Sequence, residues 1–333
     1  EARLLLDGVP LVGDVELHFN VSDWHQHQHE CDANYARVVL HVVLYPERRH
    51  PHPVLTSKGR APEVLYLMPV LNRDLEPYAM HQALLELEQQ DDLEWLARFL
   101  QRPLTQRLSR LTELAQQRWE QKLSYARRRL QRGDWETACH QYALEVLGYA
   151  RNRVPMLRVA ERYPLSAWRA GGLDVDQLFA AEAAHWRLNG LRPANHPRRR
   201  LRQYQKLVEA DPQWPERLAQ FLRALPAVDA QLPTKAFRQA ARLPTVRSRL
   251  DASVFCTAIA ATRLNTLVVD ALLPLATAAG LLDGKGYWLH WSPGDSPDAV
   301  RRFLKHAAIT NRQRPHSNGW HQGALTLFLR RGI

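Results

Sequence analysis

Short apolar runs mark the first 75 residues of the chain. The clearest are VELHF (15–19), VVLHVVLY (38–45) and EVLYLMPV (63–70), with Gly, Pro or Asn close to their ends. Short runs rich in Val, Leu and aromatic residues between such punctuating residues are typical of β-strands. The pattern therefore predicts a small β-sheet in this part of the chain.

Beyond residues 70–80 the apolar residues recur at helical spacing instead. The segments with this pattern are 82–101, 104–131, 134–148, 174–188, 199–210, 214–224, 263–282 and 297–308. The sequence therefore predicts an α+β protein. We expect a small mixed β-sheet with a flanking helix at residues 1–75, and a larger all-α domain at residues 76–333. Residues 309–323 are polar and predict a surface connection or a lid.

The first predicted strand carries a row of polar residues. Side chains alternate along a strand, so Asp14, Glu16 and His18 share one face. Closely spaced carboxylates repel one another unless a cation offsets their charge. Mg²⁺ or Mn²⁺ would do so with oxygen ligands, and a turn at Pro10–Gly13 would bring Asp7 to the same site. The alternative is a polar row on a solvent-facing edge strand.

Histidines follow this strand at an unusual density. His25, His27 and His29 lie in the run DWHQHQH, where an extended chain would place all three on one face and a helix would pair His25 with His29. Imidazole ligates metals and shuttles protons near neutral pH. We expect these residues to orient phosphate or carry protons, with a surface cluster as the alternative. His41, inside VVLHVVL, is expected to be a core histidine.

These motifs together resemble an uncharacterised bacterial family of unknown function. The resemblance rests on GDVELH (13–18), SDWHQHQH (22–29) and NYARVVLHVV (34–43). Further matching segments are LGYARNRVPMLRVAERYP (147–164), LRPANHPRRRL (191–201), RLNTLVVDALLPL (263–275) and WHQGAL (320–325). The resemblance spans most of the chain but implies no particular activity.

A weaker resemblance is to the PD-(D/E)XK nuclease core. That core places an Asp on one strand and an acidic residue, followed two positions later by Lys, on the next, to bind Mg²⁺ and activate water. Asp7 and Glu16-Leu17-His18 follow this pattern, except that His18 stands where Lys is expected. The resemblance implies catalytic roles for Asp7, Glu16 and His18. Together with Asp14 from the polar row, these residues form the catalytic set that we expect, in which Asp7, Asp14 and Glu16 hold the metal and His18 assists the activation of water.

A second candidate feature is strongly basic. Between residues 190 and 206 the chain contains six cations and no acidic residue, among them Arg192, Arg198, Arg199, Arg200 and Arg202. Arginines at a predicted helix start are unfavourable there, and a phosphate backbone would relieve that conflict. The alternatives are a solvated charged face and ion pairs within the protein.

Composition narrows the class of protein. The chain has 45 Lys+Arg against 34 Asp+Glu, a net charge of +11, and its hydrophobic content of 45% is that of a globular protein. Three isolated cysteines favour a reducing, cytoplasmic setting. The longest apolar stretch, 272–282, is too short to span a bilayer. P-loop, dinucleotide-binding, nucleophile-elbow and H-E-x-x-H motifs are absent.

These observations favour a nucleic-acid-processing protein, with a Mg²⁺- or Mn²⁺-dependent nuclease as the leading hypothesis and DNA or RNA as partner. The alternative is a non-catalytic nucleic-acid-binding or assembly subunit. Protein partners or a homo-oligomer are compatible with either hypothesis.

Overall fold

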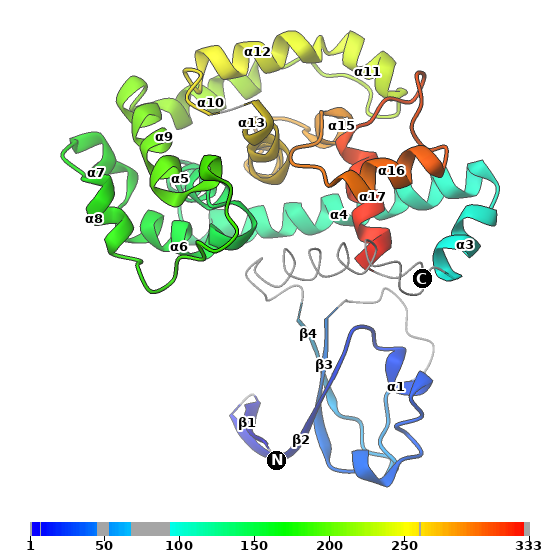
Figure 1. Cartoon of the computed structure of the whole chain (residues 1–333). Helices are drawn as coiled ribbons and strands as arrows, with labels where there is room; N and C mark the ends of the chain where they lie inside the picture. Colours follow the sequence, from blue (N-terminus) through cyan, green and yellow to red (C-terminus); the bar gives the residue numbers. More distant parts are fainter. Residues whose placement is uncertain (1, 7, 45–52, 68–93, 260, 330–333) are drawn as a thin grey trace. The chain divides into compact units, whose positions relative to one another are not determined.

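The computed structural model describes residues 2–6, 8–44, 53–67, 94–259 and 261–329. The chain divides into two compact units, Glu1–Leu75 and Glu76–Ile333, which we call the sheet unit and the helical unit. The sheet unit holds a four-stranded mixed sheet and the helical unit is built of helices (Figure 1). The predicted α+β class is confirmed.

The strands follow one another across the sheet in chain order. β1 (Ala2–Leu6) pairs antiparallel with β2 (Val9–His18), which pairs parallel with β3 (Val38–Val43), and β3 pairs parallel with β4 (Glu63–Tyr66). The first turn includes Gly8, whose φ of 83° lies in the region that favours glycine. The turn predicted at Pro10–Gly13 is wrong, because β2 runs through these residues.

Parallel strands need a crossover connection, and this connection shapes the sheet unit. The segment between β2 and β3 holds the short helix α1 (Asp23–Gln26) and the 3₁₀ turn η1 (Ala33–Tyr35). Trp24 of α1 is fully buried, and its indole Nε1 donates to the Leu55 carbonyl at 3.0 Å. Trp24 packs in a small core with Val21, Val38, Val43 and Val54. This packing fixes α1, and the histidines that follow it.

At the end of β2 the apolar side is exposed and the polar side is buried, the reverse of the usual arrangement. Leu17 and Phe19, on the apolar side of the strand, are 66% and 63% exposed. The side chain of His18, on the polar side, is only 6% exposed. The crossover connection therefore buries the polar side of β2 near its end.

In the described part of the helical unit, a short break separates the first two helices, and the second of them, with 29 residues, is the longest of the described helices. The described helices are α3 (Glu94–Gln101), α4 (Leu104–Arg132), α5 (Trp135–Leu147), α6 (Tyr149–Arg162), α7 (Leu165–Ala170), α8 (Val175–Ala180), α9 (Pro197–Ala210), α10 (Trp214–Arg223), α11 (Thr234–Ala240), α12 (Leu243–Ser253), α13 (Ala261–Leu267), α14 (Leu273–Ala278), α15 (Lys285–His290), α16 (Asp298–His306) and α17 (Asn318–Leu329), with a 3₁₀ turn η2 (Pro193–Asn195) and a π-helix η3 (Val268–Leu272).

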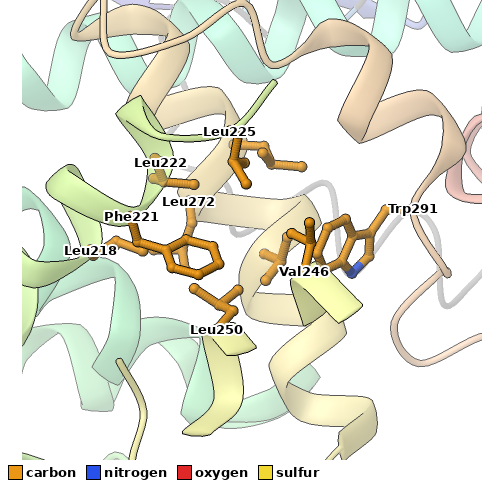
Figure 2. Close-up of a pocket in the computed structure, with 10 residues that line it drawn as sticks. Leu218, Phe221, Leu222, Leu225, Val246, Leu250, Leu272 and Trp291 are labelled. Carbon is orange, nitrogen blue, oxygen red and sulfur yellow. The ribbon is translucent and has the colours of Figure 1, made fainter. Parts of the chain in front are cut away.

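Two apolar clusters form the core of the described part of the helical unit, and the larger one contains a small cavity (Figure 2). Its lining includes Leu218 and Phe221 of α10, Val246 and Leu250 of α12, and Trp291. The indole Nε1 of Trp291 donates to Asn265 at 3.2 Å. Because the lining is apolar, we assign this cavity to the core.

Helix α17 packs closely on α4, as Figure 1 shows. A Cβ atom on Gly323 would lie 2.4 Å from the carbonyl oxygen of Leu111, so only glycine permits this approach. Asn318, at the start of α17, is fully buried. The expectation of a surface connection or lid over 309–323 is therefore wrong at its C-terminal end, where the polar residues enter a buried helix.

Among the described residues, no helix is both long and apolar enough to cross a membrane.

Candidate metal centre

A helix-ending turn places two histidines beside the sheet. After α1, Gln28 adopts a left-handed conformation with φ of 58°. The amide of Gln28 donates to the His25 carbonyl, and the amide of His29 donates to the Trp24 carbonyl, both at 3.1 Å. This pair of bonds is a Schellman motif, and the rings of Trp24 and His29 meet edge to face at 5.3 Å. The reversal turns His27 and His29 toward β2, an arrangement that is neither the extended nor the helical one predicted.

Gln28→Gly is expected to stabilise this turn by about 0.5–1 kcal/mol, because a side chain makes the left-handed conformation costly. Hydrogen exchange of the His29 amide measures the effect directly, and it should slow. Gln28→Val should accelerate the same exchange. Faster exchange in the glycine variant would contradict the assigned turn.

Three imidazole nitrogens meet at the end of β2. Nε2 of His18 lies 3.2 Å from Nδ1 of His27 and 3.3 Å from Nε2 of His29. One nitrogen from each of these residues lies within 4.8 Å of the other two. Oε1 of Glu16 lies 3.5 Å from the same His18 nitrogen. We call His18, His27, His29 and Glu16 the histidine cluster.

Aromatic rings and one further histidine support the cluster. Tyr35 stacks on His29 with ring centroids 3.6 Å apart, and His29 is 5% exposed. Nδ1 of His18 lies 2.9 Å from Nε2 of the fully buried His41. His27, in contrast, is exposed. The cluster is thus held from the protein side and open to solvent beside His27.

Burial governs the protonation of the cluster. Burial, aided by the neighbouring His29, lowers the pKa of His18 to about 4, although Asp23 acts in the opposite direction. Burial also lowers the pKa of His29, against the opposing effect of Glu16. Both imidazoles are therefore largely neutral at pH 7. The neutral form is the one that binds a metal ion.

The predicted carboxylate site is only partly assembled around this cluster. Glu16 joins it, and its side chain is 26% exposed. Asp14 lies on β2 next to a register shift in the pairing with β3, and it is not in the group of clustered ligands. Asp7 lies outside the described residues. Oxygen coordination of Mg²⁺ or Mn²⁺ by all three carboxylates stays a prediction.

The histidines of the run DWHQHQH have other neighbours than the sequence predicted. His25 turns aside, with Nδ1 3.3 Å from Oε1 of Glu30. His27 and His29, predicted to orient phosphate or carry protons, share the cluster with His18. His41 is a core histidine as expected, but its contact with His18 was not foreseen. The signal for this grouping was the H-x-H spacing next to a strand that ends in His18.

The five arginines of the predicted basic site lie around the start of α9. Arg200 differs from the other four because its side chain is buried. Arg200 is 5% exposed. Its guanidinium donates to Oδ1 of Asn195 at 2.7 Å and to Oε1 of Gln203 at 2.8 Å. A side chain in this position holds the helix start together, so its location does not support a contact with phosphate.

The other four arginines of this segment are exposed. Arg198 and Arg202 lie 3.2 Å and 3.8 Å from Asp176, which offsets part of their charge. Arg192 and Arg199 complete the exposed set. The positive charge of Arg198 and Arg202 is thus partly offset by an ion pair within the protein, as one of the alternatives predicted. The positive charge of Arg192 and Arg199 remains on the surface.

Comparison with known proteins places this chain in a family. The sequence model of the protein family described as "Protein of unknown function (DUF2851)" matches residues 1–181, more than half of the chain. The chain belongs to the DUF2851 family. The matched part of this DUF2851 protein includes the whole histidine cluster. No curated protein and no solved structure matches it.

The match confirms the predicted resemblance to an uncharacterised family over residues 1–181 of the DUF2851 protein. The segments at 191–201, 263–275 and 320–325 lie beyond the matched residues. The comparisons show no resemblance to the PD-(D/E)XK nuclease core, which stays a prediction.

Proposed function

We propose that this DUF2851 protein is a divalent-metal-dependent phosphodiester hydrolase that acts on nucleic acid, with the histidine cluster as its reaction centre. The observation that carries the proposal is the convergence of three imidazole nitrogens beside a carboxylate at the end of β2. Three protein ligands and an open position are typical of catalytic metal sites. The exposed side of the cluster, beside His27, leaves room for water and substrate.

The chemistry follows from this arrangement. His18, His27 and His29 would hold the metal ion, which when bound would supply a water molecule activated for attack. Glu16 accepts the proton of that water, and the water oxygen forms a bond to phosphorus. The bond between phosphorus and one ester oxygen breaks, and solvent protonates the leaving oxygen. In this scheme Glu16 is the general base and His18 a metal ligand, whereas the sequence predicted Glu16 as a metal ligand and His18 as a catalytic residue that does not bind the metal.

The basic start of α9 supports nucleic acid as the substrate class. Arg192 and Arg199 are exposed, and no acidic residue lies between residues 190 and 206. Arginine side chains bind phosphate oxygens through paired hydrogen bonds.

The free thiols of Cys31, Cys139 and Cys256 support a reducing, cytoplasmic location.

Glu16→Ala and His18→Ala are expected to abolish cleavage of labelled DNA or RNA, because one removes the base and the other a ligand. Loss of a general base alone reduces the rate by about 10²–10⁴-fold. The assay adds Zn²⁺, Mn²⁺ or Mg²⁺ in turn to chelator-treated protein. His25→Ala is the matched control, because His25 belongs to the same run but not to the cluster. Equal cleavage by wild type and Glu16→Ala would exclude this function.

A non-catalytic nucleic-acid-binding or assembly subunit is the second candidate, favoured by the exposed cations of α9. In that case the protein binds labelled DNA or RNA without cleaving it. The binding constant would fall steeply with salt concentration and would not change when metal is removed.

Measuring the molecular mass of the chain in solution tests whether it forms a homo-oligomer.

A further inference from the structure

We infer that the histidine cluster is a resident site for a transition-metal ion of the Zn²⁺ class, and that His41 is the residue that orients His18 toward it. The inference deepens the proposed function, on which it rests for the location of the reaction centre. It concerns which ion the site selects, and which buried residue makes the selection possible.

The spacing of the nitrogens fits a tetrahedral ion. A Zn²⁺ ion lies 2.0–2.1 Å from each imidazole nitrogen, so two nitrogens on a tetrahedron are about 3.3–3.4 Å apart. Nε2 of His18 lies 3.2 Å from the His27 nitrogen and 3.3 Å from the His29 nitrogen. Two of the three edges therefore already have the length that a shared ion requires.

Hydrogen bonding alone does not account for this convergence. A single hydrogen on Nε2 of His18 can point at only one of its two nitrogen neighbours. If that nitrogen carries no hydrogen, its lone pair must accept from both His27 and His29. Nδ1 of His29 is buried without a hydrogen-bond partner, so the His29 ring gains nothing on its other side. A cation among the three lone pairs satisfies all of them together.

The donor set also selects among ions. Imidazole nitrogens suit Zn²⁺, Co²⁺ and Ni²⁺, whereas Mg²⁺ prefers oxygen ligands and keeps several waters. Within the cluster only Glu16 offers oxygen. The donor set thus departs from the Mg²⁺ or Mn²⁺ that the carboxylate pattern predicted.

His41 contacts His18 through the ring nitrogen that does not face His27 and His29. Its Nε2 lies 2.9 Å from Nδ1 of His18, and its side chain is fully buried on β3. When His41 accepts the hydrogen of His18 Nδ1, the lone pair of His18 Nε2 faces the cluster. Glu16 pairs with His41 across the two strands, so the sheet itself fixes this geometry. Such outer partners of metal-binding histidines set the tautomer and the ring orientation.

Calorimetry on the chelator-treated chain of residues 1–333 tests the inference, with Zn²⁺ and then Mg²⁺ as titrants. We expect one equivalent of Zn²⁺ to bind in the presence of excess Mg²⁺. His27→Ala should lose this binding, and His25→Ala should keep it. His27 is exposed, so its replacement leaves the fold intact, and circular dichroism verifies this. Zn²⁺ binding that is equal in the two variants would overturn the site.

The role of His41 has its own readout. His41→Leu should weaken Zn²⁺ binding by about 10- to 100-fold, and His41→Gln, which keeps an acceptor, should restore part of it. With Co²⁺ as the probe, the visible absorption of a tetrahedral ion should be lost in His41→Leu and return in His41→Gln. An unchanged Co²⁺ spectrum and affinity in His41→Leu would refute the positioning role.

The outcomes separate this inference from the proposed function. Zn²⁺ binding at the cluster without cleavage of nucleic acid would keep the metal site and exclude the reaction. Cleavage that requires only Mg²⁺, with no Zn²⁺ bound, would overturn the metal site and keep the reaction.

Discussion

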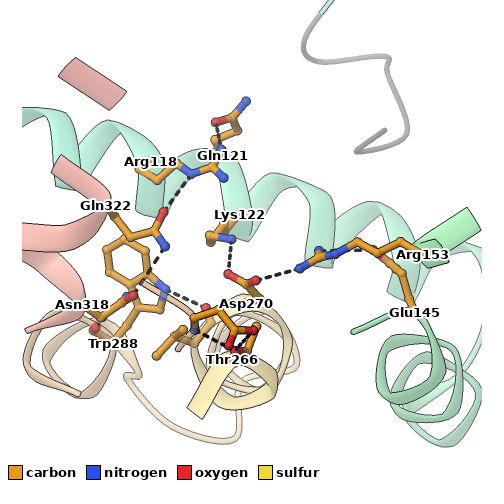
Figure 3. Close-up of polar contacts among 12 residues, drawn as sticks. Arg118, Gln121, Lys122, Glu145, Arg153, Thr266, Asp270, Trp288, Asn318 and Gln322 are labelled. Atoms are coloured by element: carbon orange, nitrogen blue, oxygen red, sulfur yellow. Dashed lines mark hydrogen bonds and ion pairs between the residues drawn. The ribbon is translucent and has the colours of Figure 1, made fainter. Parts of the chain in front are cut away.

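Asp270→Asn is expected to lower the free energy of unfolding of the helical unit by about 3–5 kcal/mol, because it breaks a buried ion-pair network. Oδ1 of Asp270 accepts from Lys122 Nζ at 2.8 Å and Oδ2 accepts from Arg153 at 3.0 Å (Figure 3). The side chains of Lys122, Asp270 and Arg153 are 9%, 15% and 17% exposed. The substitution removes the negative charge that two largely buried cations share.

The ionisation of Asp270 shows how strongly the network acts. Burial by itself would raise the pKa of this carboxyl. The ion pairs with Lys122 and Arg153 outweigh burial and hold the pKa of Asp270 well below its usual range. Asp270 lies in the π-helix η3, where an inserted residue alters the direction of side chains along the helix.

Urea unfolding of the full chain, followed by circular dichroism, measures this prediction. The matched control is Asp298→Asn, in an exposed pair with Arg301 on α16, and it should change the unfolding free energy little. The double variant Lys122→Met/Asp270→Asn should be more stable than the sum of its single changes predicts. A loss for Asp270→Asn no greater than that for Asp298→Asn would contradict the role of the network.

Acidification from pH 6.5 to pH 4 is expected to destabilise the helical unit by several kcal/mol. Burial, opposed by bonds to two backbone carbonyls, lowers the pKa of His140 to about 4. Burial and the nearby His316 lower the pKa of His321 to about 3. Burial also lowers the pKa of His316 to about 4, with help from two arginines. These three imidazoles are neutral in the folded protein at pH 7.

The direction of the effect follows from proton binding. An unfolded histidine takes up its proton near pH 6.5, whereas His140 in the folded protein does so only near pH 4. Between these values the unfolded state holds more protons, so stability falls as the pH falls. The difference of 6.5 − 4 = 2.5 pH units for His140 corresponds to about 3 kcal/mol. Above pH 6.5 this contribution to stability is fully present.

The contacts of His140 explain why charging it is costly. Nδ1 lies 2.6 Å from the hydroxyl of Tyr204, and Nε2 lies 2.9 Å from the Tyr163 carbonyl. A neutral ring can accept from the hydroxyl and donate to the carbonyl. A charged ring carries hydrogens on both nitrogens, so the Tyr204 hydroxyl loses the acceptor for its own hydrogen.

Urea unfolding at several pH values between 7 and 4.5 measures the slope. His140→Gln cannot take up a proton, so its slope should be smaller than that of wild type by about 1.4 kcal/mol per pH unit. His306→Gln, at an exposed position on α16, is the control and should keep the wild-type slope. A wild-type slope in His140→Gln would disprove the assignment.

Local patterns predicted much of the fold. The runs at 15–19, 38–45 and 63–70 overlap β2, β3 and β4, because short apolar runs between turn residues have few other structures open to them. Helical spacing likewise located α4, α5, α9 and α10. Helix α17 was not among the predicted helices, because its first residues, NGWHQG, are polar and its burial depends on the close approach of Gly323 to α4.

The candidate centre was predicted in part. The sequence marked Glu16, His18, His27 and His29 as chemically relevant but divided them between a carboxylate metal site and a phosphate site. Their grouping depends on the left-handed residue Gln28 and on the buried Trp24. Neither feature has a periodic signature, since Gly rather than Gln usually occupies such a turn.

By itself, the sequence determined the α+β class, the alternation that puts Glu16 and His18 on one side of a strand, and the concentration of arginines before and within α9. These properties depend on residue types and on the fixed periods of strand and helix. The tertiary structure decided which polar groups meet. Crossover packing and the turn at Gln28 bring His27 and His29 to His18, while folding buries Arg200 and sets Asp176 beside its neighbours. Contacts between residues distant in sequence depend on how whole elements pack, and the local pattern does not contain that information.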